Sequence, residues 1–395
     1  MKILHVADLH LGMVTHSRPD PTTGLPSRLL DVARCWRRAC EIAAERSVDA
    51  VIVAGDIFHG PNPDAAALNL FAEGLRELAG IPALLIAGNH DRSPHPNRSS
   101  VLELFADGEG LVHVSTRPEV VEVGGLRVAT LPSVSRHQLM AAREGTSRLA
   151  ADEAVIESLE RVIEDYRSRE VDVLTGHWPV QGTVLGGEKD IAIIPEPMLP
   201  MASLVEGPWH LAAFGHIHSR QEQQLGERWF GYAGSIDRMN FGEEGEEKVA
   251  IEWELPTTGT RAAARHHILP AREFRTFDFA GDDAARLLAD PAWCWDDEAE
   301  HIGGIEEAIV RIRISDVDVE VDQATIQRSA MEAGAHVALV QVERRRRSPS
   351  RNERVTEELG AGDALEEWFE TAQILEAERP ALRELAKQLE EAIGS

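Results

Sequence analysis

The stretch from Ile3 to His10, ILHVADLH, decides the fold of this chain. It is mostly apolar up to Ala7 and then presents Asp8 and His10. A short apolar run that ends in polar side chains is typical of a buried strand in a parallel sheet, with chemistry at its carboxyl end. Because Asp8 and His10 stand two residues apart, an extended chain places both side chains on one side, where both reach one metal ion.

Four later segments repeat this arrangement of an apolar run that ends in metal-ligand side chains. They end at Asp56 and His59, at Asn89, His90 and Asp91, at His177, and at His216 and His218. In open α/β sheets, ligands bind outside the carboxyl ends of the strands, so these ends predict one shared site. Taken singly, a buried His is more often a hydrogen-bonded core residue, and an Asp after a strand is more often a helix cap. The combination is what indicates a site.

The spacing between these segments predicts the fold class. A helical stripe over about residues 27–46 and a helix from Asp64 alternate with apolar strands at 50–54 and 83–87. Such alternation favours a parallel sheet with crossover helices. From Trp209 onward the pattern is rich in strands. We therefore expect an α/β fold, with an αββα two-sheet sandwich over residues 1–255.

The remainder of the chain predicts three further parts. Residues 266–343 hold two strands that bracket a helix, which indicates a small α/β domain. Residues 344–360 form an Arg-rich linker, read either as a solvated tether or as a contact to DNA phosphates. Residues 361–395 predict a helix-loop-helix whose apolar faces must be covered. They pack either on the chain's own small domain or on helices of a partner.

Composition narrows the class of protein. The chain has 395 residues, which predicts two or three domains, and a net charge of −27. This charge opposes unaided, non-specific binding to nucleic acid, and we count Glu243, Glu244, Glu246 and Glu247 in the acidic surface. Three cysteines without metal-finger spacing argue against a disulfide framework. With no expected membrane span and no room for a signal peptide before the first strand, we expect a cytoplasmic protein.

The ligand types predict a two-metal site. Oxygen and nitrogen donors without cysteine suit manganese, iron or zinc, and there are more of them than one catalytic ion needs. Two ions share a carboxylate, for which Asp56 is our candidate, and can hold a water that attacks a phosphoester. His90 is surplus to coordination, so it is available to donate a proton to the leaving oxygen or to stabilise the phosphorus centre. Asp91 is the residue we expect to orient His90.

The five segments, in this order, resemble the motifs of the calcineurin-like metallophosphoesterase superfamily. The motifs are D-x-H at Asp8/His10, G-D at Gly55/Asp56, G-N-H-D at Gly88–Asp91, a lone His at His177, and G-H-x-H at Gly215–His218. Within the superfamily, VADLHLG, GDIFH with His59 and the segment Tyr232–Lys248 are similar to the SbcD nuclease branch, which acts in DNA double-strand-break repair. The resemblance covers roughly residues 1–255.

This resemblance implies a manganese-dependent DNA exonuclease and endonuclease acting on double-stranded ends and hairpins. One ion would be held by Asp8, His10, Asp56 and His218, and the other by Asp56, Asn89, His177 and His216. His90 would be the catalytic histidine, with Asp91 beside it, and His59 would contact the scissile phosphate. The small domain would cap the site and guide DNA. The terminal helices would bind an SbcC-type SMC-like ATPase, and two copies would form a homodimer.

Two other functions remain open on the sequence. The first is a phosphodiesterase or phosphatase of the same superfamily that acts on small molecules. A small-molecule esterase has little use for a capping domain and a partner-docking tail, so length disfavours it. The second is a non-catalytic scaffold that brings an ATPase to DNA ends, which the complete set of ligand positions disfavours.

Overall fold

The computed structural model describes most of the chain up to residue 344. The described residues are 1–93, 99–107, 110–134, 147–184, 196–256, 262–295, 305–317, 319–344, 365, 369, 379, 380 and 382–384. The Arg-rich linker beyond residue 344 and most of the terminal helix-loop-helix lie outside them, so the predictions for those parts stay predictions.

The first large sheet contains the stretch that opens the chain and has the strand order β12-β11-β1-β2-β3-β4. Its strands are β1 (Lys2–Val6), β2 (Ala50–Val53), β3 (Ala83–Ile86), β4 (Val112–Ser115), β11 (Val249–Glu254) and β12 (Ala263–Ile268). Strands β1 to β4 pair in parallel, and β11 runs antiparallel to β1. Helices α1 (Ser27–Arg46) and α2 (Ala65–Glu77) and the short 3-10 helix η1 (Val101–Phe105) make the crossovers. Parallel pairing needs such crossovers, because a tight hairpin reverses the chain direction.

The second large sheet has the order β5-β6-β7-β8-β10-β9. Its strands are β5 (Glu119–Val123), β6 (Leu126–Leu131), β7 (Val173–His177), β8 (Leu211–Gly215), β9 (Gln221–Leu225) and β10 (Arg228–Tyr232). Strands β6, β7, β8 and β10 are parallel, and the edge strands β5 and β9 run antiparallel to their neighbours. Helices α4 (Arg148–Arg167) and α5 (Met201–Val205) precede β7 and β8.

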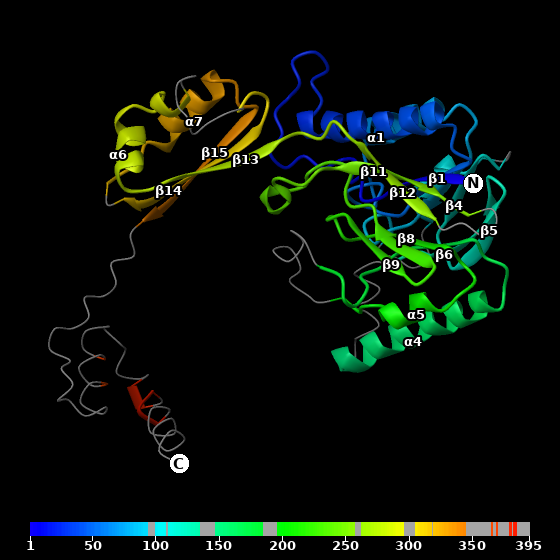
Figure 1. The fold of residues 1–395 in the computed structure, drawn as a ribbon. Coiled ribbons are helices and arrows are strands. Elements are labelled where there is room, and N and C mark those ends of the chain that lie inside the picture. The colour runs from blue at the N-terminus through cyan, green and yellow to red at the C-terminus, as the bar shows by residue number, and fades with distance from the viewer. Residues whose placement is uncertain are drawn as a thin grey trace. The chain divides into compact units, whose positions relative to one another are not determined.

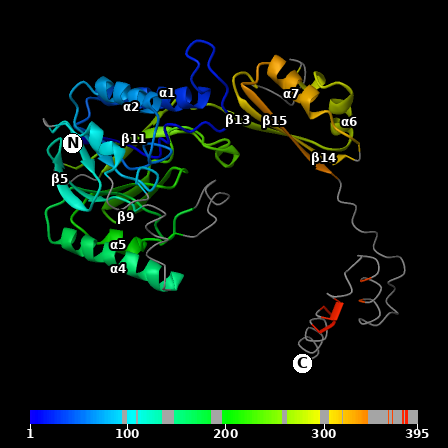
Figure 2. The ribbon, with the colours of Figure 1, turned by 180° about the vertical axis from the view of Figure 1, so that it is seen from behind.

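Three apolar clusters hold four layers together. Leu4 and Val6 of β1 pack with α1 and α2, while Ile3 of the same strand faces the second sheet, since neighbouring strand residues point to opposite faces. Leu174 of β7 packs with Ile163 of α4. Helices α1 and α2 therefore cover one outer face, and α4 and α5 cover the other (Figures 1 and 2). The predicted αββα sandwich is confirmed.

A third, three-stranded sheet has the order β13-β14-β15. It comprises β13 (Phe274–Phe279), β14 (Ile309–Val317) and β15 (Val337–Arg344), with helices α6 (Gly281–Ala289) and α7 (Gln323–Glu332) and the short η4 (Trp293–Trp295). The two strands and the helix between them that the sequence indicates correspond to β14, α7 and β15. Strand β13 and α6 are additions, and residues 266–268 pair in the first sheet as part of β12.

The chain divides into two compact units, residues 1–314 with 321–342 and residues 315–320 with 343–395. In the second unit, the guanidinium groups of Arg379 and Arg383 lie 5.8 and 5.5 Å from the centre of the Phe369 ring. Across the described helices, none combines the length and the apolarity that a bilayer crossing requires.

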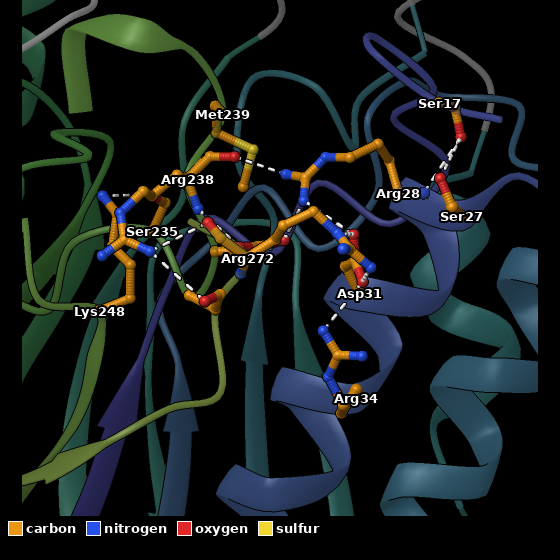
Figure 3. Close-up of polar contacts among 12 residues, drawn as sticks. Ser17, Ser27, Arg28, Asp31, Arg34, Ser235, Arg238, Met239, Lys248 and Arg272 are labelled. Carbon is orange, nitrogen blue, oxygen red and sulfur yellow. Dashed lines mark hydrogen bonds and ion pairs between the residues drawn. The ribbon is translucent and has the colours of Figure 1, made fainter. Parts of the chain in front are cut away.

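A buried network of charged side chains joins α1 to the segment that leads into β13 (Figure 3). The fully buried Arg28 guanidinium donates to Asp31 at 3.1 Å, to Asp237 at 2.7 Å and to the Arg238 carbonyl oxygen at 2.5 Å. Arg272 donates to both Asp31 carboxylate oxygens, at 2.5 and 2.7 Å. A charge without water needs partners on every side, so each member of this network depends on the others.

Asp237→Asn should destabilise the protein, because it removes a negative charge from a buried cation. We expect a loss of about 3–5 kcal/mol in the free energy of unfolding in urea. As a control, Arg37→Met breaks an ion pair with Glu73 in which both side chains are about half exposed, and should cost less than about 1 kcal/mol. Equal losses in the two variants would show that the network adds no stability.

Glu252 of β11 should make part of the stability pH-dependent. Burial raises its pKa, but hydrogen bonds from Arg46 and His267 outweigh burial and hold the pKa below its ordinary value. A lowered folded-state pKa stabilises the fold above the unfolded pKa of about 4.3, and this contribution is lost as the pH falls through the folded value. Glu252→Gln should therefore be less stable than the parent at pH 7, with the gap narrowing towards pH 3. Urea unfolding at several pH values measures it, and a constant gap would contradict it.

Candidate metal centre

The residues singled out from the sequence meet at the carboxyl ends of strands in both large sheets. Strand β1 leads into Asp8 and His10, β2 into Asp56 and His59, and β3 into Asn89, His90 and Asp91; β7 ends at His177, and β8 leads into His216 and His218. These residues form three groups, and within each group the ligand atoms all lie within 4.8 Å of one another. The groups are Asp8 with His10 and His218, Asp8 with Asp56 and His177, and His10 with His59 and His90.

The backbone bends sharply where these side chains leave their strands. Asp8, His10, Asp56 and His216 all have positive φ values, of 52°, 50°, 51° and 108°. Residues other than glycine rarely adopt this region, and such strain gathers at functional sites. Hydrogen bonds from the Asp8 N–H to the Gly55 carbonyl oxygen and from the His10 N–H to that of Asp56, at 3.0 and 2.9 Å, hold the bends in place. The bent backbone thus accompanies the gathering of these side chains at one site.

The first ligand group brings two imidazoles face to face. The Nε2 atoms of His10 and His218 lie 3.2 Å apart, and both rings are nearly or fully buried. The Nδ1 atom of His218 donates to the Glu243 carboxylate at 3.1 Å, so neutral His218 directs an Nε2 lone pair towards His10. Two nitrogen donors and the Asp8 carboxylate converge here. This donor set fits a divalent cation.

The second group is also rich in electron donors. The His177 Nδ1 donates to the Ala54 carbonyl oxygen at 2.8 Å, which leaves Nε2 facing the site. That Nε2 lies 3.2 Å from Asn89 Oδ1, 3.3 Å from Asp56 Oδ2 and 3.9 Å from Asp8 Oδ1. Burial lowers the pKa of His177, but the two carboxylates outweigh burial and raise the pKa to about 10. Metal binding needs the unprotonated ring, so an ion that binds here competes with the proton that the carboxylates favour.

Asp56 belongs to the second group and also faces the first. Its Oδ1 accepts a hydrogen bond from the His90 backbone N–H at 2.9 Å, which fixes the carboxylate. Its Oδ2 lies 3.3 Å from His177 Nε2 and 3.8 Å from His10 Nε2, one nitrogen from each group. A single oxygen that faces both groups is the geometry that a shared ligand requires.

The His90 side chain is more exposed than those of His10, His177, His216 and His218. It is 38% exposed, and its Nε2 lies 4.0 Å from Asp56 Oδ2. Its Nδ1 donates to the His59 carbonyl oxygen at 2.9 Å, and the His59 and His90 rings lie 5.7 Å apart between centres. His90 is therefore held by a main-chain acceptor and can still meet a substrate.

Asp91 does not orient His90 in this structure, contrary to the expectation from the sequence. Its fully buried carboxylate accepts hydrogen bonds from the backbone N–H groups of Ile57, Phe58 and Gly88, at 3.1, 2.9 and 2.9 Å. Those groups belong to the loops that follow β2 and β3. Asp91 therefore links the loop of Asp56 to the loop of Asn89. The ring of His90 instead hydrogen-bonds to the carbonyl oxygen of His59.

His216 lies apart from the three compact ligand groups. Its backbone N–H donates to both Asp8 carboxylate oxygens, at 3.2 and 3.1 Å, while its Nε2 lies 3.5 Å from Glu196 Oε2. Its ring packs edge-on against His177, with 5.2 Å between centres. Glu196 is a site residue that the sequence did not single out, because it belongs to none of the five motifs.

Glu243 is a second residue that the sequence placed wrongly. We expected it in the acidic surface, but it is 0% exposed and forms a 2.6 Å ion pair with the buried Lys248. Of the four glutamates in that run, only Glu247 is exposed. The run G-E-E-G-E-E-K resembles a solvated loop in composition, so only the three-dimensional fold separates the buried carboxylate from its neighbours.

Glycines leave room for the ligands. A Cβ on Gly55 would lie 2.2 Å from His177 Nδ1, and φ there is +97°; a Cβ on Gly88 would lie 2.1 Å from Asp56 Oδ1. Real Cβ atoms do not approach ring or carboxylate atoms so closely. The glycines before Asp56 and Asn89 are therefore steric requirements of the ligand cluster.

Gly55→Ala should displace His177 and cost the protein metal. We expect at least a tenfold loss of manganese affinity in isothermal titration, together with a lowered melting temperature, because the new methyl group collides and the backbone is strained. Gly60→Ala is the matched control, since a Cβ there meets nothing within 4 Å. Unchanged manganese binding by the Gly55 variant would remove His177 from the proposed ligands.

Comparisons with known proteins agree with this arrangement. The calcineurin-like phosphoesterase family model matches residues 1–220. The chain is 27% identical over 267 residues to the D component of the SbcCD nuclease of Bacillus subtilis (strain 168), which covers 63% of this chain and 64% of that protein. It is 37% identical over 139 residues to the DNA double-strand break repair protein Mre11 of Aeropyrum pernix, covering 33% and 32%.

A similar solved structure is a dimetal phosphatase from Danio rerio, with 14% identity, a TM-score of 0.45, and coverage of 68% of this chain and 96% of that one. The chain spans somewhat less than two thirds of the Bacillus relative. The family model, in contrast, spans more than half of the 395 residues and includes all five motifs. The chain belongs to the calcineurin-like phosphoesterase family, a family of metal-dependent hydrolases.

Proposed function

We propose that this chain hydrolyses phosphodiester bonds at DNA ends with two divalent ions, as the nuclease component of an SbcCD-like repair complex. The observation that carries the proposal is Asp56 Oδ2, which faces one imidazole from each of two ligand groups. A pair of ions with a shared carboxylate is an arrangement suited to phosphoester hydrolysis. The nuclease and repair names of the relatives support DNA as the substrate class.

The ligands divide between the two ions as the resemblance implies. One ion is held by Asp8, His10, Asp56 and His218, and the other by Asp56, Asn89, His177 and His216. In the first set, Asp8, His10 and His218 form a compact group and Asp56 Oδ2 lies 3.8 Å from His10 Nε2. In the second, Asn89 Oδ1 and Asp56 Oδ2 lie 3.2 and 3.3 Å from His177 Nε2. His216 would complete the second set, although it belongs to none of the three compact groups. Manganese suits this mixture of carboxylate, amide and imidazole donors.

When bound, two ions would supply Lewis acidity and favour loss of a proton from the attacking water to the solvent, and the chain's residues would do the rest. The water oxygen forms a bond to phosphorus, and the bond from phosphorus to the leaving oxygen of the sugar breaks. In the protonated form of His90, Nδ1–H stays on the His59 carbonyl oxygen, and Nε2–H faces the site. That proton passes to the leaving oxygen. His59, whose ring is stacked on that of His90, would contact the scissile phosphate, as the resemblance implies.

The remaining parts of the proposal concern DNA and partners. The small α/β region, residues 266–343, serves as a capping domain that guides DNA, and the terminal helix-loop-helix binds an SbcC-type ATPase. Two copies pair as a homodimer, and we place the complex in the cytoplasm. The net charge of −27 supports a division of labour in which a partner supplies much of the DNA affinity.

A substrate comparison tests the reaction class. The chain is assayed with and without its candidate ATPase partner on linear duplex DNA, on hairpin DNA and on a small aryl phosphodiester, with manganese, magnesium or zinc. We expect manganese-dependent release of nucleotides from DNA. Hydrolysis of the small ester alone would favour the small-molecule phosphodiesterase, and DNA binding without cleavage would favour the scaffold.

His90→Gln should abolish cleavage without loss of metal. We expect the turnover number on duplex DNA to fall about 10²–10⁴-fold, which is the usual contribution of a general acid, with manganese content unchanged. His113→Gln is the control, because that side chain is equally exposed, at 38%, and pairs with Glu119 of β5. Turnover at the parent rate in the His90 variant would exclude this residue as the proton donor.

A further inference from the structure

Glu243 lies behind the candidate metal centre and has every carboxylate oxygen engaged. It ends the short 3-10 helix η3 (Phe241–Glu243) and is fully buried. Its Oε1 accepts from His218 Nδ1 at 3.1 Å. Its Oε2 accepts from Ser235 Oγ at 2.9 Å and from the Met239 backbone N–H at 3.1 Å, and pairs with Lys248 Nζ at 2.6 Å. These contacts prevent the carboxylate from rotating.

The contact with His218 determines which ring nitrogen carries the hydrogen. A carboxylate only accepts, so Nδ1 must be protonated, and neutral His218 then keeps its lone pair on Nε2. That Nε2 is the atom 3.2 Å from His10 Nε2, inside the ligand group of Asp8, His10 and His218. A buried carboxylate behind a ligand imidazole fixes the ring orientation and strengthens its donor atom.

A purely structural ion pair with Lys248 does not account for this arrangement. Lys248 Nζ has a second carboxylate partner, Glu246 Oε2 at 2.8 Å, and also donates to the His218 carbonyl oxygen at 3.2 Å. The positive charge is therefore compensated from the other side. Glu243, in contrast, faces His218 with the oxygen that does not face Lys248.

Contacts with the small sheet hold η3 in position. The carboxylate of the next residue, Glu244, accepts from the Thr276 backbone N–H at 2.7 Å and from Thr276 Oγ1 at 2.5 Å. The Phe241 ring packs edge-on against Phe274, with 4.9 Å between centres, and lies 4.4 Å from the Arg311 guanidinium carbon. Helix η3 is thus anchored on β13 and β14 as well as on its own loop.

We propose that Glu243 is a positioning residue for metal binding, which holds His218 in the tautomer and orientation that present Nε2 to an ion. The inference rests on the metal site proposed above. It adds to that site a residue that touches no ion, and it assigns Glu243, Ser235 and Lys248 a role in setting the affinity for metal.

The test uses paired variants of the full chain, because removal of Glu243 alone would leave Lys248 short of a buried partner. Glu243→Gln with Lys248→Met keeps an oxygen acceptor for His218, whereas Glu243→Met with Lys248→Met removes it; both variants lack the charged pair. Glu252→Gln is the matched control: Glu252 is another buried glutamate that accepts from a histidine, His267 at 2.8 Å, and from a cation, Arg46, away from the site.

Two measurements report on the site without catalysis. The first is manganese affinity by isothermal titration. We expect the Met variant to bind one of two ions about 10–100-fold more weakly than the parent, and the Gln variant to fall between them. The second is the ¹⁵N spectrum of His218 in metal-free, histidine-labelled protein, assigned by its loss in His218→Gln. We expect the Nδ1–H tautomer in the parent and a mixture in the Met variant.

The outcomes separate this inference from the proposed function. Two manganese ions bound by the parent, with parental affinity and tautomer in the Met variant, would overturn the role of Glu243 and leave the metal site standing. A parent that binds no divalent ion would overturn the proposed function and with it the role in metal binding. A loss of manganese affinity in Glu252→Gln as large as in the Met variant would show a general effect of stability, and would also overturn the inference.

Discussion

The structure depends on concentrating electron-donor atoms where water is scarce. Asp8 and Asp56 are at most 3% exposed, and the Nε2 atoms of His10, His177 and His218 point towards them or towards one another. Carboxylates lose their hydration on burial, and unprotonated ring nitrogens cannot donate hydrogen bonds that would replace it. Positive charge is the remaining way to balance such a cluster. The carboxylates raise the pKa of His177, so a proton on its ring can supply part of this charge, and divalent ions would supply more.

Two stable sheets make this cluster possible. Left-handed backbone at Asp8, His10 and Asp56 and crowded contacts at Gly55 and Gly88 would not persist in an isolated loop. They persist because the parallel pairing of β1, β2 and β3 fixes the strand ends, and because Asp91 ties two of the following loops together. The apolar core of the sandwich thus offsets the strain, and the rigid ends confine the ligands to a small volume.

Much of the fold and most of the candidate ligand positions were predictable from the sequence. Each candidate ligand stands at or just after a short apolar run, and such a run predicts a strand without knowledge of distant residues. Side chains with distant partners were not predictable in this way. Glu243 lies in an acidic run and becomes a buried residue only through Ser235, Lys248 and His218. Asp91 follows His90, yet its acceptor atoms face backbone groups of another loop. Composition and spacing hold no information about such contacts. The carboxyl ends of parallel strands, in contrast, always meet at the same edge of the sheet.

The segment between β10 and β11 connects the ligand cluster to the rest of the molecule. Ser235 and Glu243 of this segment hold the main chain and the ring of His218, and Phe241 and Glu244 hold β13. Asp237 in the same segment accepts from Arg28 and from the Arg272 backbone N–H, where the chain leaves β12 for the small sheet. A single loop therefore carries both the support of a ligand histidine and the attachment of the small sheet. The charged groups of this segment depend on one another for their compensation. A change that displaces the segment at the small sheet should therefore also displace the residues that hold His218.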